Sequence, residues 1–200
     1  MKLSKIVSLL VIFVMLNSCA SSYHKINPNN LSYNSNDTKN GVTLDYKYDL
    51  LSKKYSKKET KKGVKVIAIK ISNNSQSDII FGKNFKLVYN NGNELIIMNN
   101  DKVFKSLKQN TISYLFYLLL TPLNLTVSSG SQSTSTPIGF IIGPGLAGGN
   151  MLVAGSANKK FKNELLEFNL QGVTIKKGET KSGLIGIKSD NYDAIKIKMK

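Results

Sequence analysis

The chain has 200 residues and a formal net charge of +16 at pH 7. This length suits one ordinary domain with a core, and 41% hydrophobic residues exclude a wholly disordered chain. A single cysteine and a single histidine exclude an intramolecular disulfide and a metal centre built from cysteine or histidine pairs. All 28 basic residues are lysine. Arginine is preferred for bidentate contacts to phosphate and bases, so its absence argues against a dedicated nucleic-acid binder.

The amino-terminal segment has the pattern of a secretion signal. Two lysines precede an uncharged apolar stretch over residues 6–16, which is short for a transmembrane helix. The next residues are Leu16-Asn17-Ser18-Cys19: an aliphatic residue three before the cysteine, and a small residue just before it. This resembles the lipobox of bacterial lipoproteins, with Asn17 as a less usual middle residue.

The resemblance to bacterial lipoproteins implies the fate of this segment. A diacylglycerol would be attached to Cys19, residues 1–18 would be removed, and two or three acyl chains would anchor the protein durably. No aspartate or acidic cluster follows the cysteine. In bacterial lipoproteins such residues act as retention or surface-export signals, so the resemblance implies an outer-membrane protein facing the periplasm. Residues 19–40 are rich in Ser, Asn and Lys, and we predict a flexible tether there in which His24 has no role.

Short runs of alternating apolar and polar residues predict strands over residues 41–100. The lysine-rich run between the first two is predicted to be a solvated turn or edge, and an Asn-Asn-Gly-Asn turn joins the last two. The expected strands are Val42 to Asp49, Val64 to Ser72, Asp78 to Phe81, Phe85 to Tyr89, and Glu94 to Met98. The lysine-rich run is Lys53 to Lys62.

The carboxy-terminal part is predicted to hold one helix and three strands. Residues 156–170 place Phe161, Leu165 and Phe168 at helical spacing, which indicates an amphipathic helix packed on the domain. Glu164 and Glu167 are expected on its solvent side, and we expect no catalytic role for this carboxylate pair. The three expected strands are Val173 to Ile175, Leu184 to Lys188, and Ala194 to Met199.

The order of strands and turns resembles the immunoglobulin-like sandwiches of small secreted bacterial domains, without their disulfide or core tryptophan. The resemblance implies a mainly β fold with a single domain over residues 41–200. Residues from about 101 to 172 would form one long insertion between its strands, apolar, rich in glycine and partly helical. Such an insertion is thermodynamically tolerated.

The middle of the chain carries no charge from Thr111 to Asn158, although lysine is abundant elsewhere. An apolar run that begins at Thr111 and a glycine-rich run, residues 137–155, flank a Ser/Thr-rich spacer; Pro144 and Asn150 interrupt the second run. Three interpretations stay open: an excursion packed on the domain, a hairpin dipping into the membrane, or a partner or self-association surface. The expected membrane or partner contacts in residues 111–157 are Tyr114, Leu115, Phe116, Leu118, Leu119, Phe140, Ile141, Ile142 and Leu146.

The sequence predicts a protein that binds or scaffolds rather than an enzyme. It has no histidine network, second cysteine or nucleotide-binding glycine motif, and we expect no catalytic residue, cofactor or metal. Expected partners are the membrane, through a lipid on Cys19, and anionic lipid, an envelope protein or a second copy; no nucleic acid is expected. One alternative is a membrane-inserting or self-assembling hairpin protein. An uncharacterised hydrolase is the second alternative.

Overall fold

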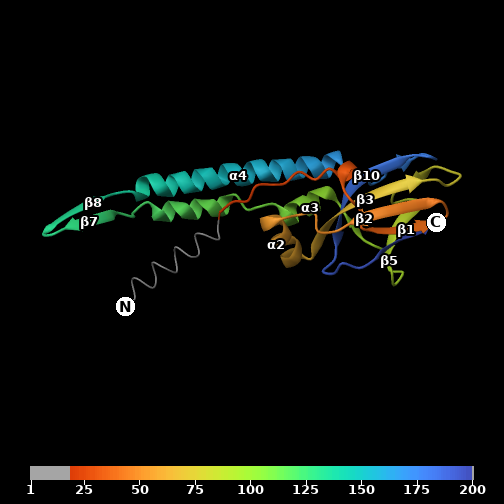
Figure 1. Cartoon of the computed structure of the whole chain (residues 1–200), viewed down its shortest axis with the longest axis horizontal. Coiled ribbons are helices and arrows are strands. Elements are labelled where there is room, and N and C mark those ends of the chain that lie inside the picture. The colour runs from red at the N-terminus through yellow and green to blue at the C-terminus, as the bar shows by residue number, and fades with distance from the viewer. Residues whose placement is uncertain (1–18, 200) are drawn as a thin grey trace. The chain divides into compact units, whose positions relative to one another are not determined.

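The computed structural model describes residues 19–199, so the predicted signal peptide, residues 1–18, lies outside the described part (Figure 1). Strands and helices each make up about a third of the chain. The antiparallel strands and the helical insertion are therefore present, with a larger helical share than a mainly β fold implies. The chain divides into two compact units: unit 1 is Met1–Ser22 with Gln109–Ala157, and unit 2 is Tyr23–Lys108 with Asn158–Lys200.

Unit 2 is built on a five-stranded antiparallel sheet with the strand order β1-β2-β3-β10-β6. Its central strand β3 is buried along nearly its whole length, as its run of β-branched residues predicts. The β10 strand pairs with β3 over nine residues, with Gly183 opposite Ile69. The strands are β1 (Ser35–Lys39), β2 (Val42–Lys47), β3 (Val64–Asn73), β10 (Thr180–Lys188) and β6 (Ile97–Met98).

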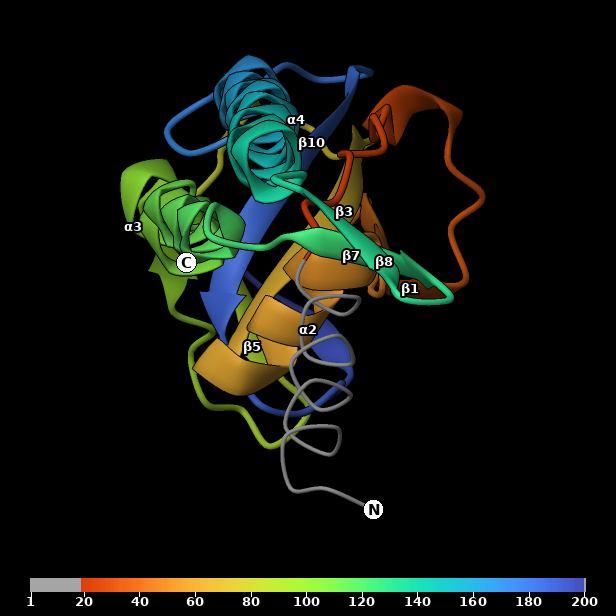
Figure 2. The ribbon, with the colours of Figure 1, turned by 90° about the vertical axis from the view of Figure 1, so that its left-hand side faces the viewer.

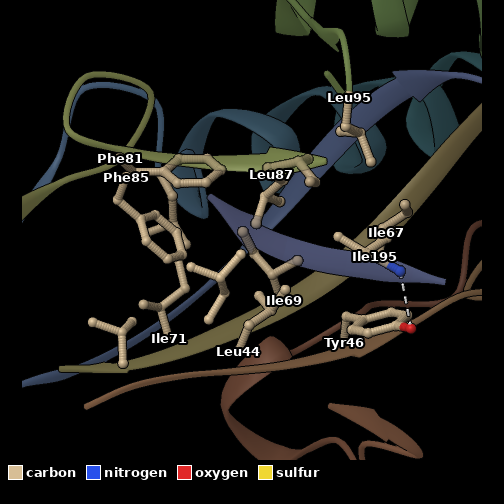
Figure 3. Packing of buried hydrophobic residues seen from close by; sticks show 14 of the residues in the cluster. Leu44, Tyr46, Ile67, Ile69, Ile71, Phe81, Phe85, Leu87, Leu95 and Ile195 are labelled. Carbon is tan, nitrogen blue, oxygen red and sulfur yellow. Dashed lines mark hydrogen bonds between the residues drawn. The ribbon is translucent and has the colours of Figure 1, made fainter. Parts of the chain in front are cut away.

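Two short antiparallel pairs cover one face of this sheet. The first is β5 (Phe85–Tyr89) with β11 (Ile195–Met199), and the second is β4 (Ile79–Ile80) with β9 (Thr174–Ile175). Figure 3 shows Leu44 and Ile69 of the large sheet facing Leu87 across the core. Tyr46 lies in the same core and its hydroxyl oxygen accepts a hydrogen bond from the Ile195 amide at 3.1 Å. The core of unit 2 therefore lies between two layers of strands.

The predicted strands are present, with different bounds. The β5 strand matches its expected range. The β10 strand begins at Thr180, four residues before the expected start at Leu184. These first residues are polar or glycine, so the sequence pattern does not mark them as a strand, but they pair with β3. The β6 strand is reduced to two residues, although Glu94 keeps one bridge to Val88.

The run Lys53–Lys62, predicted as a solvated turn or edge, is a helix, α2. Tyr55 and Glu59 are four residues apart, lie on one helical face and are buried, so this face packs while the lysines stay in solvent. The helix ends at Gly63, whose φ of 57° suits glycine. Side chains of α2 also bind two distant places in unit 2: the Tyr55 hydroxyl donates to Asn158 Oδ1 at 3.0 Å, and Lys58 Nζ donates to the Lys108 carbonyl.

The prediction of a flexible tether over residues 19–40 is wrong for most of this range. Tyr23 and Ile26 are buried in unit 2, a short 3-10 helix η1 forms over Pro28–Asn30, and β1 pairs with β2. The sequence does not indicate these contacts, because the segment is mostly polar. Single aromatic and aliphatic side chains hold it in place, and they form no periodic apolar pattern.

A glycine of β10 sets the distance to α3 (Asn100–Leu107), a helix the sequence analysis did not predict. A Cβ at Gly186 would overlap the side chain of Val103, which is fully buried. We expect Gly186→Ala to lower the free energy of unfolding by about 1–3 kcal/mol through overpacking. Chemical denaturation measures this, and adding Val103→Ala to Gly186→Ala should recover part of the loss. A double variant no more stable than Gly186→Ala would contradict this assignment.

Unit 1 contains a 3-10 helix, a hairpin and most of a long helix. These are η2 (Ile112–Leu120), β7 (Leu125–Ser129), β8 (Gln132–Thr136), and α4 (Gly139–Glu167), whose residues from 158 onward belong to unit 2. Figures 1 and 2 show η2 and α4 side by side, with the hairpin continuing beyond them. The helix α4 runs through Pro144 and Asn150, which were expected to interrupt it. Close packing explains this, because Gly139 lies against the Leu120 and Thr121 backbone and Gly143 lies beside Tyr117.

Candidate functional site

Unit 1 presents large apolar side chains to the outside along both of its helices. Phe116 is 69% exposed and Ile141 is 80% exposed. Soluble proteins leave single apolar residues exposed, but contiguous patches of this kind mark contact with a membrane or another protein. This apolar surface comprises Ile112, Leu115, Phe116, Leu118 and Leu119 on η2, and Phe140, Ile141, Ile142, Leu146, Leu152 and Val153 on α4.

The two helices contact each other through a narrow inner stripe. Tyr114 and Tyr117 of η2 pack with Ala147 and Ala154 of α4, and the two tyrosine rings are parallel with centroids 6.5 Å apart. Tyr114 was predicted as an external contact, but it is only 3% exposed. That prediction is wrong, because the small residues of α4 admit the ring into the helix–helix interface. The other eight predicted contact residues all belong to the apolar surface.

The part of α4 in unit 1 has no polar face. Between Gly139 and Gly155, its one polar side chain is Asn150, which donates to the Leu146 carbonyl at 2.8 Å. A helix that lies on a membrane surface needs a polar side toward water, whereas one that is apolar all round is enclosed by apolar material. Among the described residues, α4 is the one helix long and apolar enough to cross a membrane, with a mean hydropathy of 1.3 in its most apolar window.

Two amides of unit 1 hold the residues that follow Cys19. The Ala20 amide donates to Asn150 Oδ1 at 2.5 Å. Gln109 brackets Ser21: its Oε1 accepts from the Ser21 amide at 2.9 Å, and its Nε2 donates to the Ser21 carbonyl at 2.6 Å. Cys19 itself is exposed. The predicted lipidation position is therefore fixed beside the apolar surface rather than carried on a free tether.

The carboxylate of Glu164, expected on the solvent side of its helix, is buried within unit 2. Its Oε2 accepts from the Tyr23 hydroxyl at 2.5 Å, and its Oε1 accepts from the Ile26 amide at 2.9 Å. Tyr23 also packs against Tyr55 and Phe161, with ring centroids 5.3 and 5.4 Å away. Both carboxylate oxygens thus hold the amino-terminal segment in place. No group of three or more metal-ligating residues occurs in the part of the chain that the structure describes.

A second buried carboxylate, Glu59 of α2, gives unit 2 a pH-dependent stability. Burial raises its pKa to about 7, although its Oε1 accepts from the Val66 amide at 2.7 Å. The unfolded pKa is lower, so the native state holds this proton more tightly, and stability falls as the pH rises through about 4.5 to 7. The shift is worth on the order of 3 kcal/mol.

We therefore expect Glu59→Gln, which keeps the acceptor for Val66 and removes the charge, to stabilise the protein above pH 7 and to flatten this pH dependence. Urea denaturation at pH 5 and pH 8 measures both effects, with the exposed Glu167→Gln as the control. Equal pH slopes in the Glu59→Gln and wild-type proteins would show that Glu59 does not titrate as described.

An open groove of about 730 Å³ lies on unit 2 beside β4 and β5. Phe81, Leu87 and Leu95 form its floor, and Ile96 at its edge is 71% exposed. Its lining holds Lys83, Lys86 and Glu94, the last two joined by an ion pair, and it contains no serine, cysteine or histidine.

The chain matches no protein-family model, no curated protein and no solved structure. The sequence analysis missed Gln109 and the role of Asn150. A lone amide inside a charge-free run is a usable signal for Asn150, because an isolated polar side chain in apolar surroundings needs a hydrogen-bonding partner.

Proposed function

We propose that this protein is a lipid-anchored cell-envelope protein with a non-catalytic binding or scaffolding role, in which unit 1 enters the membrane. One observation carries the proposal: the outward side chains of both helices of unit 1 are apolar apart from Ser113, whose hydroxyl donates to the Asn110 carbonyl, in a segment without charge from Thr111 to Asn158. Of the three interpretations left open by the sequence, an excursion packed on the domain would bury these side chains. Lipid satisfies such a surface, which water does not.

The position of Cys19 supports the same proposal. Acyl chains on this thiol would start next to the apolar surface, because Ala20 and Ser21 are bound to Asn150 and Gln109. The acyl chains and unit 1 would then enter the same leaflet and act as one anchor. We propose the outer membrane, with unit 2 in the periplasm.

The lysines of unit 2 support a supplementary contact with anionic lipid. The helix α2 carries six of them between Lys53 and Lys62 and a single acid, Glu59, which is buried. Basic segments close to a membrane gain about 1 kcal/mol per lysine from anionic headgroups.

The two packed strand layers of unit 2 support our proposal of a sandwich fold of immunoglobulin-like character.

Thiol accessibility in native membranes tests the proposal. In the full chain, an acylated Cys19 leaves any engineered cysteine as the one free thiol, so wild-type protein should not react with a membrane-impermeant maleimide. We expect Phe116→Cys and Ile141→Cys to be protected until detergent is added. Tyr192→Cys, on the exposed side of unit 2, is the matched control and should react at once.

Two outcomes would contradict the proposal separately. A reactive wild-type protein would show that Cys19 is free, and would remove the lipid anchor. Phe116→Cys and Ile141→Cys reacting as fast as Tyr192→Cys would show that unit 1 lies in water.

A further inference from the structure

The helices of unit 2 carry a high density of positive charge. Six lysines lie on α2, three on α3 and its cap, and three on α4 between Asn158 and Glu167. Two acids of these helices, Glu59 and Glu164, are buried and hydrogen-bonded inside unit 2, while Asp101 and Glu167 are exposed. The ion pairs described for unit 2 involve lysines of its strands, namely Lys70, Lys86, Lys181 and Lys196.

Hydrogen bonds hold these three helices together. Lys58 of α2 donates through Nζ to the carbonyl of Lys108, the residue that caps α3. Asn100, at the start of α3, donates through Nδ2 to the Leu165 carbonyl of α4 at 2.6 Å. All of these residues belong to unit 2. One connected group of helices therefore presents the lysines of α2, α3 and α4.

Lysines of two helices lie around the ring of Phe104 on α3. The Nζ atoms of Lys108 and Lys162 are 5.8 and 5.6 Å from its ring centroid, within the range of cation–ring attraction. Both lysines are exposed, and the half-buried Lys58 is bonded to the backbone of Lys108. We call Lys58, Lys108 and Lys162 the lysine site. In the part of the chain that the structure describes, none of the three forms an ion pair.

Like charges oppose one another at the lysine site. Burial lowers the pKa of the Lys58 ammonium, and the positive charges of its neighbours lower this pKa further; in order of effect, these neighbours are Lys62, Lys108, Lys54 and Lys61. Ammonium groups that repel one another cost free energy, and an anion bound among them recovers it. The arrangement therefore favours an anionic ligand.

The lysine site also borders the charge-free segment along the chain. Lys108 is the last charged residue before this segment, and Lys159 and Lys160 are the first after it, followed by Lys162. Basic clusters directly beside a membrane-inserted segment lie at the level of the lipid headgroups, and basic pockets there bind phosphate-bearing headgroups. Lysine binds phosphate as a point charge, without the bidentate geometry of arginine. Charge and position together favour the phosphate of a lipid over a soluble anion.

We propose that the lysine site binds a lipid headgroup that carries two phosphate groups. This inference rests on the membrane entry of unit 1 proposed above, which brings Lys108 and Lys159 to the headgroup level. Three ammonium groups exceed the single negative charge of one phosphodiester, so a headgroup with two phosphates neutralises more of the site. A general attraction to negative lipid depends on total surface charge alone, whereas this site depends on how the phosphates are paired.

A bound headgroup would give unit 2 a fixed orientation on the membrane. The apolar surface of unit 1 and a lipid on Cys19 hold the chain at the bilayer, but neither contacts the helices α2 and α3. A headgroup held between Lys58, Lys108 and Lys162 would place these helices against the membrane surface. The strands of unit 2 would then stay available to a partner.

Vesicle flotation at constant total charge tests the headgroup site. The protein is the chain from residue 19 onward with Cys19→Ser, so that no acyl chain contributes. Three vesicle types are compared: phosphatidylcholine alone, phosphatidylcholine with cardiolipin, and phosphatidylcholine with twice that amount of phosphatidylglycerol. The last two have the same phosphate charge, which cardiolipin presents in pairs. We expect cardiolipin vesicles to bind at least about fivefold more tightly than phosphatidylglycerol vesicles, the equivalent of one further lysine contact.

The matched variants remove equal charge from two places in unit 2. Lys108→Gln with Lys162→Gln changes two exposed positions, so the fold is kept, and should weaken binding to cardiolipin vesicles about 30-fold. Binding to phosphatidylcholine alone should not change. Lys176→Gln with Lys198→Gln removes exposed lysines near the strands β9 and β11 and should weaken cardiolipin binding by less than about threefold, because distant surface charges are screened. Lys108→Arg with Lys162→Arg keeps the charge and should keep the preference.

Each contrary result has a separate meaning. Equal binding to cardiolipin and phosphatidylglycerol vesicles would overturn the headgroup site, and so would equal losses in the two glutamine variants. Inorganic pyrophosphate that binds the protein as tightly as cardiolipin vesicles do would show that the lysines take soluble phosphate, and would also overturn it. Binding to cardiolipin vesicles without any binding to phosphatidylcholine would overturn the membrane entry of unit 1 and leave the headgroup site standing.

Discussion

Lysine at both Phe116 and Ile141 should release the lipid-free protein from membranes. These side chains are 69% and 80% exposed on the two helices of unit 1, so the double variant changes the apolar surface without disturbing the stripe between the helices. Each lysine in a membrane-inserted helix costs about 3 kcal/mol. Two such charges amount to about 6 kcal/mol, or more than a 10⁴-fold loss of partitioning.

The measurement is flotation with vesicles, using the chain from residue 19 onward with Cys19→Ser, so that no lipid holds it. We expect the parent protein to float and Phe116→Lys with Ile141→Lys to stay at the bottom of the gradient. The control is Ile96→Lys with Leu166→Lys, which adds the same charges at exposed apolar positions of unit 2. If the two double variants float equally, unit 1 is not the membrane contact.

Replacing Phe161 by alanine should destabilise unit 2 by about 3–5 kcal/mol. Phe161 is fully buried and lies among three other rings, with centroids 5.2 Å from Tyr55, 5.4 Å from Tyr23 and 6.2 Å from Phe104. Tyr55 lies on α2, Phe104 on α3 and Tyr23 in the amino-terminal segment, so a cavity at this position of α4 would loosen the packing of all of them. A loss of this size is a large share of the stability of a domain.

Chemical denaturation of the same lipid-free protein measures this loss, and Phe140→Ala is the matched control. Phe140 is 67% exposed in unit 1, and its truncation should change the free energy of unfolding by less than about 0.5 kcal/mol. A loss below about 1 kcal/mol for Phe161→Ala would contradict the packing described for this cluster.

The strands of unit 2 could be predicted because each has an apolar face with a regular period. Val64 to Ser72 was expected as a strand, and β3 is buried on both faces at the centre of the sheet. The amphipathic part of α4 was expected for the same reason, since Phe161 and Leu165 repeat at helical spacing and are both buried. Eight of the nine predicted contact residues of the charge-free segment are exposed. A run of apolar residues without charged neighbours is therefore a usable signal for such a surface.

The features that the sequence did not predict depend on single contacts, which leave no periodic pattern of apolar residues. The helix α2 was missed because Tyr55 and Glu59 are its two buried residues among lysines. Glu164 was placed in solvent because a carboxylate has no apolar signal, while Tyr23 and Ile26, far away in sequence, supply its partners. The long continuous α4 was missed because glycine and proline lower helix propensity, and close packing against η2 overrides that local preference.

Two side chains of α2 bind Asn158 and the Lys108 carbonyl, and so hold two distant points of the chain together. These are the residues of unit 2 at which the chain leaves for unit 1 and returns from it. An inserted segment whose two ends are held by one short helix can change in length while the domain that carries it keeps the same boundary. Residues 109–157 can therefore differ in length or sequence without changing the point at which unit 2 closes.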